Sequence, residues 1–301
     1  MSYTVVIGSA NIDISLSLNQ EVIWRDSNIG SIRLSPGGVG RNIAENLARI
    51  GVSTHFITPL GDEVDADLLK DSCINNEVVL HQIKHEGITT SKYAALFDNH
   101  KDMVVGVADT KSVETLQKDT FDPTIDLIKN ADRLVLETNL SASTLAYLAT
   151  LNDTVFINAI STVKATRIEP IYSKIDTLSL NRLEAEALTN MTIDETSLRD
   201  VRDFFTKKGV KTIVVTMGKE GAYFMNSQTI RKQSARKTDV LNTSGAGDAF
   251  FAGYIYGIEN KMDPLRTATA LASLTLESED TVKQTLNEKI LNERIEALTH
   301  E

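Results

Sequence analysis

A glycine turn that carries a single carboxylate lies late in the chain, where residues 242–253 read NTSGAGDAFFAG. Glycine permits positive φ and a close approach of the backbone to a ligand, and the apolar run after it predicts a helix whose free N–H groups favour an anion. Asp248 falls in the first turn of that helix, where the positive helix end favours an ionised carboxylate. Such a group can accept a proton from a hydroxyl that attacks a phosphoryl group. Taken alone, the segment fits an ordinary acidic first turn equally well.

A second glycine cluster stands early in the chain, where residues 35–42 read SPGGVGRN before a helical pattern that ends at Gly51. Gly38 allows close backbone approach, and Asn42 brings a side-chain donor and acceptor to the helix start. Asp13 follows the first apolar run, at the end of a strand where α/β proteins bind ligands. A carboxylate and an amide together suit a polyhydroxylated substrate, although each could equally cap a turn or a helix.

Short apolar runs alternate with amphipathic stretches along the chain and must position these residues. The β-branched runs predict buried parallel strands, at 4–8, 55–59, 133–137, 155–159, 177–181 and 211–217. Apolar residues at helical spacing predict helices between them, at 41–51, 63–76, 143–151, 183–190 and 197–209. This alternation predicts an α/β fold with a doubly wound, mostly parallel sheet flanked by helices.

Two early segments break this alternation, at 14–34 and 90–107. Both alternate apolar and polar residues as half-exposed antiparallel strands do, and DNHKD at 98–102 is typical of a hairpin turn. We predict that the two segments form a small β-sheet lid beside the main domain. A dimer contact and decorative edge structure are the alternatives.

Composition limits the classes of partner. The chain has 301 residues with 31 basic and 41 acidic side chains, a net charge of −10. Nucleic acid and anionic membranes reward basic surface, so neither is expected as the main partner. The single cysteine, Cys73, allows no internal disulfide. With no apolar stretch long enough for a membrane helix and no signal-like start, we expect a cytoplasmic protein.

The common nucleotide-binding fingerprints are missing, since neither G-x-x-x-x-G-K-[ST] nor a G-x-G-x-x-G after the first strand occurs. The combination of GGVGRN near the start and GAGD near the end instead resembles the ribokinase-like (PfkB) carbohydrate kinases. NRLE at 181–184 resembles the family's N-x-x-E motif, and VVTMGKEGAYF at 214–224 resembles its nucleotide-binding strand and turn. The resemblance spans nearly the whole chain and implies one kinase domain over residues 1–301, with the lid inserted at 14–34 and 90–107.

The resemblance implies a role for each matching residue. Asp248 matches the base that deprotonates the substrate's primary hydroxyl. Glu184 matches the motif residue that organises Mg²⁺, through water, and magnesium indeed keeps waters and uses few carboxylates. The other matches are Gly245, Ala246 and Gly247 at the anion hole; Asn181, Thr216, Gly218 and Ser244 at the nucleotide; and Asp13, Gly38, Asn42 and Glu137 at the substrate.

The implied cofactor is Mg²⁺ with ATP, and three departures from the family pattern matter. Many members hold K⁺ with an aspartate before the GAGD turn; Asn242 stands there in this chain, which leaves potassium dependence open. Asn158 stands at a strand end that often carries aspartate, so a carboxylate near the metal region is lost. Glu137 stands where one subgroup often has aspartate, which keeps the charge and lengthens the reach by a methylene.

That subgroup is the pseudouridine kinases, which GSANID, SPGGVGRNIAENLA and LNRLEAEAL also resemble. The resemblance implies phosphorylation of pseudouridine at its 5′-hydroxyl by ATP, and a homodimer formed through the lid. The alternatives are a kinase for ribose, another nucleoside or another furanose, and a non-catalytic nucleoside-binding regulator on the same scaffold.

Overall fold

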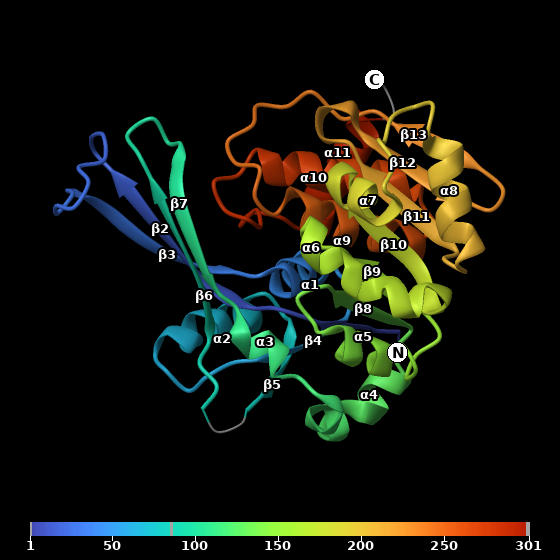
Figure 1. Cartoon of the computed structure of the whole chain (residues 1–301), viewed down its shortest axis with the longest axis horizontal. Coiled ribbons are helices and arrows are strands. Elements are labelled where there is room, and N and C mark those ends of the chain that lie inside the picture. The colour runs from blue at the N-terminus through green and yellow to red at the C-terminus, as the bar shows by residue number, and fades with distance from the viewer. Residues whose placement is uncertain (1, 85–86, 299–301) are drawn as a thin grey trace.

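A nine-stranded sheet forms the centre of the computed structural model, which describes residues 2–84 and 87–298 (Figure 1). Its strand order is β13-β12-β11-β10-β9-β8-β1-β4-β5. Strands from β11 to β5 run parallel, whereas β12 and β13 pair antiparallel at one edge. The strands are β1 (Thr4–Ile7), β4 (Thr54–Pro59), β5 (Val79–Ile83), β8 (Arg133–Glu137), β9 (Val155–Asn158), β10 (Ile175–Asn181), β11 (Thr212–Thr216), β12 (Ala222–Asn226) and β13 (Ile230–Gln233).

Helices cover both faces of this sheet. Alternate side chains of β1 enter different cores, with Val5 and Ile7 in one and Val6 in the other, because successive strand residues point to opposite faces. The doubly wound sheet predicted from the sequence is confirmed. The helices are α1 (Val39–Arg49), α2 (Asp65–Asn75), α3 (Lys111–Glu114), α4 (Ile125–Lys129), α5 (Ala142–Leu148), α6 (Thr162–Ala165), α7 (Arg182–Thr189), α8 (Leu198–Lys207), α9 (Ala246–Glu259), α10 (Pro264–Leu276) and α11 (Glu288–Ala297), with 3₁₀ turns η1 (Lys118–Thr124), η2 (Thr166–Lys174) and η3 (Gly218–Glu220).

A second sheet of four strands, in the order β3-β2-β6-β7, projects from this body (Figure 1). Its strands are β2 (Asn11–Leu18), β3 (Gly30–Gly37), β6 (Ser91–Phe97) and β7 (Met103–Asp109). They run beyond the segments 14–34 and 90–107, because backbone pairing continues through residues whose side chains do not alternate in polarity, such as Asn11 opposite Gly37. We call these four strands the lid sheet.

One face of the lid sheet is apolar. The pairing register aligns two rows across all four strands, Leu34–Ile14–Ala94–Val107 and Ile32–Leu16–Leu96–Val105. Asp13 belongs to the opposite face, because neighbouring strand residues alternate. The edge residues of the apolar face are exposed, with Ile32 at 72% and Val107 at 63%. An exposed apolar sheet face of this kind is typical of a surface that another protein surface covers.

Two smaller expectations can be compared with the structure. No helix among the described residues is long and apolar enough to cross a bilayer. Cys73 is buried near the end of α2, and burial raises the pKa of its thiol to about 12, so it packs as a small apolar group.

Candidate active site

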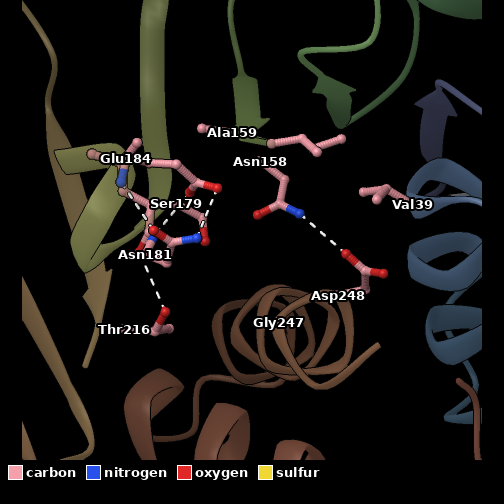
Figure 2. A pocket seen from close by; sticks show the side chains of 11 residues that line it. Val39, Asn158, Ala159, Ser179, Asn181, Glu184, Thr216, Gly247 and Asp248 are labelled. Atoms are coloured by element: carbon pink, nitrogen blue, oxygen red, sulfur yellow. Dashed lines mark hydrogen bonds between the residues drawn. The ribbon is translucent and has the colours of Figure 1, made fainter. Parts of the chain in front are cut away.

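Asp248 lies where the sheet and α9 meet. Its carboxylate opens into a cavity of about 190 Å³ that the ends of β9 and β10 and the start of α7 also line (Figure 2). The Asp248 side chain is only 8% exposed, yet both oxygens have partners. Asn42 donates from Nδ2 to Oδ2 at 2.8 Å, and Asn158 donates from Nδ2 to Oδ1 at 3.3 Å. A buried carboxylate is thus held from two sides by neutral amides.

The surroundings of Asp248 give it a basicity suited to proton transfer near neutrality. Burial is the main cause that raises the pKa of its carboxyl, to about 7, and the charge of Glu137 raises it further. The Asn42 and Asn158 amides and the Arg41 guanidinium act in the opposite direction. A general base works best when its pKa is close to the operating pH. Asp248 is therefore deprotonated, and able to accept a proton, above about pH 7.

Asn42 is oriented by its own neighbours. Its Oδ1 accepts from Arg41 Nη1 at 2.8 Å and from Thr281 Oγ1 at 3.2 Å. Arg41 and Thr281 both donate to Oδ1, so Oδ1 must be the end of the amide that faces them. The Nδ2 end therefore faces Asp248. Arg41 is buried, ion-paired with Glu45 and bonded to the Pro36 carbonyl at the end of β3. Sequence reasoning identified Asn42 but not Arg41 or Thr281, whose types carry no spacing signal.

The glycine turn before α9 is built as its residue types predict. Gly245 is the N-cap with φ 79°, and a Cβ there would lie 2.1 Å from the Thr281 carbonyl oxygen. Only glycine fits this close approach. Ala246 and Gly247 then open the helix, in a first turn whose N–H groups have no intrahelical acceptor. The Ala246 N–H makes a long hydrogen bond of 3.4 Å to the Thr243 carbonyl. This end of α9 is suited to hold the phosphoryl group beside Asp248.

Asn181 and Glu184 form a reciprocal cap at the start of α7. Glu184 N donates to Asn181 Oδ1, and the two Glu184 oxygens accept from Asn181 N and Nδ2, each at 2.8 Å. Burial raises the pKa of Glu184. Both residues line the small cavity opposite Asp248 (Figure 2). The described residues contain no cluster of three His, Cys, Asp or Glu side chains that could hold a metal ion. Glu184 is a carboxylate in this cavity that could hold Mg²⁺ brought in with a nucleotide.

A larger cavity of about 550 Å³ adjoins the small one through Thr216 and Gly247, which line both. Its walls are mainly apolar and include Phe250 and Leu276. Lys219 is one of the charged residues that line it. Apolar walls beside a few polar groups suit a nucleotide base with its phosphates directed towards the small cavity. The sequence pointed to Thr216 and to Gly218, which also lines this cavity, whereas Phe250 reads as ordinary core.

The four residues expected at the substrate come from three elements: Asp13 from β2, Gly38 and Asn42 from the start of α1, and Glu137 from the end of β8. Burial raises the pKa of Asp13 to about 6, and its carboxylate accepts from the Asn11 amide. Gly38 caps α1 with φ 95°, where a Cβ would lie 2.6 Å from the Ser9 carbonyl oxygen. A glycine at this position thus allows the start of α1 to pack closely against the connection between β1 and β2.

Two expected site residues have other partners in this structure. Glu137 is 1% exposed, and its oxygens accept from the backbone N–H groups of Ser9 and Asn139. Its charge acts on Asp248, and its role as a substrate ligand stays a prediction. Ser244 is exposed, and its N–H donates to Asn242 Oδ1 at 2.9 Å. Its neighbours Thr243 and Ala246 line the larger cavity.

Comparison with known proteins agrees with this geometry. Residues 1–288 match the model of the pfkB family carbohydrate kinases. The chain is 32% identical to the pseudouridine kinase of Escherichia coli (strain K12), covering 83% of this chain and 82% of that protein. It is 26% identical to a carbohydrate kinase from Agrobacterium tumefaciens with a TM-score of 0.86, over 98% and 97% of the two chains. Arabidopsis thaliana ribokinase complexed with ribose and ATP shares the fold, with a TM-score of 0.85 over 98% and 99% and an identity of 20%. The chain therefore belongs to the pfkB family of carbohydrate kinases and has their ribokinase-like fold.

Proposed function

We propose that the protein transfers the γ-phosphoryl group of ATP to the 5′-hydroxyl of pseudouridine. The observation that carries this proposal is the placement of Asp248 in the lining of the small cavity, which meets the nucleotide-sized cavity at the preceding residue, Gly247. The choice of pseudouridine rests on similarity to the Escherichia coli and Arabidopsis thaliana pseudouridine kinases, at 32% and 26% identity. We propose the cytoplasm as its location, in keeping with the buried free thiol of Cys73.

The proposed reaction is an in-line displacement. Asp248 takes the proton of the 5′-hydroxyl while the 5′-oxygen forms a bond to the γ-phosphorus. The bond from that phosphorus to the β,γ-bridging oxygen breaks at the same time and releases ADP. The N–H groups at the start of α9 would stabilise the charge that develops on the transferring group. Bound Mg²⁺ would offset phosphate charge next to Glu184. Asp13 and Asn42 would hold ribose hydroxyls.

A substrate panel tests this function. ADP release is measured with Mg-ATP and pseudouridine, uridine, ribose, adenosine or fructose in parallel. We expect activity on pseudouridine far above the others. A preference for ribose or another nucleoside would show that pseudouridine is the wrong substrate, while phosphoryl transfer by Asp248 would stand. Binding of pseudouridine by calorimetry with no ADP release would favour the non-catalytic regulator.

We also propose a homodimer formed through the apolar face of the lid sheet. Exposed Ile32 and Val107 lie at its opposite edges, so a second copy would cover the whole face. By light scattering we expect a mass near twice 33.1 kDa for the wild type. The double variant Ile32→Lys/Val107→Lys should shift to the monomer mass. Ser31→Lys adds charge to the same strand on the other face and should stay dimeric; a monomeric wild type would contradict the proposal.

Potassium should not be required for turnover. The Asn242 amide already joins two loops, since Nδ2 donates to the Glu279 carbonyl at 2.9 Å and Oδ1 accepts from Ser244 N–H at 2.9 Å. The Asn242 amide therefore links the 242–244 and 279 segments by hydrogen bonds, a link that a bound cation could otherwise provide. Replacing K⁺ by Na⁺ at constant ionic strength should change kcat by less than about twofold. Tenfold activation by K⁺ would show that the bridge opens to admit the ion.

A further inference from the structure

Asn158 places an uncharged side chain in the lining of the active-site cavity. It ends β9, in register with Glu137 on β8 and with Ser179 on β10, and is 8% exposed. Its side chain points away from the sheet towards α9, and the Nδ2–Oδ1 hydrogen bond to Asp248 spans 3.3 Å (Figure 2). Asn158 and Asp248 thus meet in a buried setting, where the charge of either side chain strongly affects the other.

The charged groups around Asp248 act on its ionisation in opposite directions. Glu137 from β8 opposes ionisation of Asp248, and Arg41 from α1 favours it. Glu184 from α7 lines the same cavity. Burial opposes ionisation more strongly than any of these groups, and the two amides offset part of that effect. A further carboxylate within hydrogen-bond distance would push the balance towards the protonated acid.

The two amides that contact Asp248 differ in their other contacts. Asn42 is shared, because its Oδ1 also accepts from Arg41 and Thr281. Asn158, among the described residues, has Asp248 as the only hydrogen-bond partner of its side chain. Within the described protein, its side chain therefore acts on the site through the carboxylate of Asp248.

We propose that Asn158 is a positioning residue, whose amide keeps the Asp248 carboxylate in one orientation and in its proton-accepting form. An ionised aspartate in the same place would repel Asp248 and favour a proton shared between the two acids. This inference rests on the proposed function only in that Asp248 serves as the base. An apolar residue of similar size would leave Oδ1 of Asp248 without its donor.

Kinetics over a range of pH provide the first test. For the wild type, kcat/KM should rise with pH through about 7, because the deprotonated carboxylate is the active form. Asn158→Asp is nearly isosteric and should move this acid limb upwards by about 1 pH unit or more, so that kcat/KM at pH 7 falls by about fivefold or more and recovers at higher pH. Asn158→Leu should shift it in the same direction by less. The KM for nucleoside should change less than kcat.

A matched control separates this effect from net charge. Asn130→Asp makes the same chemical change at an exposed position that follows α4, and its pH profile should overlay that of the wild type. Thermal melts of all variants establish that they are folded. A folded Asn158→Asp protein with the wild-type acid limb would overturn the inference.

Direct titration keeps the inference apart from the proposed function. Carbon-13 NMR of labelled aspartate carboxyls, with Asp248 assigned by comparison with Asp248→Asn, follows its protonation without substrate. Asn158→Asp should raise the midpoint of that titration. A raised midpoint in a protein that phosphorylates nothing on the panel contradicts the proposed function and supports the placement of Asn158. An unchanged midpoint in a protein that phosphorylates pseudouridine contradicts the role given to Asn158 and supports the proposed function.

Discussion

Asp248→Asn should lose turnover by about 10³-fold or more and remain folded. The amide matches the carboxylate in shape but cannot accept the proton of the attacking hydroxyl. The other residues that line the two cavities are unchanged in this variant, so KM values should change far less than kcat. The variant removes a buried acid whose pKa is raised, so above pH 7 it also removes the cost of burying a charge. The new amide also turns its NH2 towards one of the Asn42 and Asn158 donors and loses that hydrogen bond, so the melting temperature at pH 8.5 should stay close to that of the wild type.

A suitable control is Asp153→Asn, an identical change at an exposed position. It should turn over at the wild-type rate. Turnover of Asp248→Asn within tenfold of wild type would remove Asp248 from the role of base. A melting temperature far below wild type at pH 8.5 would instead show that the carboxylate serves mainly to hold the fold.

Gly245→Ala should have the second largest effect, on both stability and activity. The residue has φ 79°, and the new Cβ would overlap the Thr281 carbonyl oxygen at 2.1 Å. Backbone atoms cannot yield as a flexible side chain does, so the turn or the 281 loop must move. We expect the free energy of unfolding to fall by about 2–3 kcal/mol. Because the displaced amides would face the transferring phosphoryl group, kcat should fall by about 10²-fold or more. Chemical denaturation and steady-state kinetics measure the two effects.

Gly247→Ala, two residues later, serves as the stability control. A Cβ at Gly247 meets nothing within 4 Å, its φ is not positive, and the position is helical. The free energy of unfolding should therefore be unchanged or slightly higher, since alanine favours a helix over glycine. Its methyl group would enter the cavity, so activity is not the readout for this variant. Equal stability losses in both variants would contradict the account of Gly245.

Much of the fold could be predicted from local patterns. The runs at 4–8 and 133–137 are short, apolar and β-branched, and both are buried central strands. The ends of the lid strands could not be predicted in this way, because Asn11 and Gly37 pair through backbone atoms and leave no side-chain period. Periodicity reports side-chain burial, whereas backbone pairing can continue beyond it.

The site was partly predictable for a similar reason. Asp248, Asn181 and Thr216 stand in short motifs, and the structure brings all three to one cavity. Contacts between distant segments leave no such trace. Asn158 was interpreted as the loss of a carboxylate, whereas the structure shows its amide donating to Asp248. Thr281, which touches both Asn42 and the Gly245 position, has no sequence signal.

The most direct test of the central claim is the identity of the product. Pseudouridine and Mg-ATP are incubated with the wild-type protein, and the mixture is followed by phosphorus-31 NMR. We predict that ADP appears together with one phosphomonoester whose phosphorus is split by the two protons of the 5′-carbon, and that Asp248→Asn forms neither. Appearance of inorganic phosphate alone, or of no new signal with an intact protein that binds both ligands, would contradict transfer to the 5′-hydroxyl.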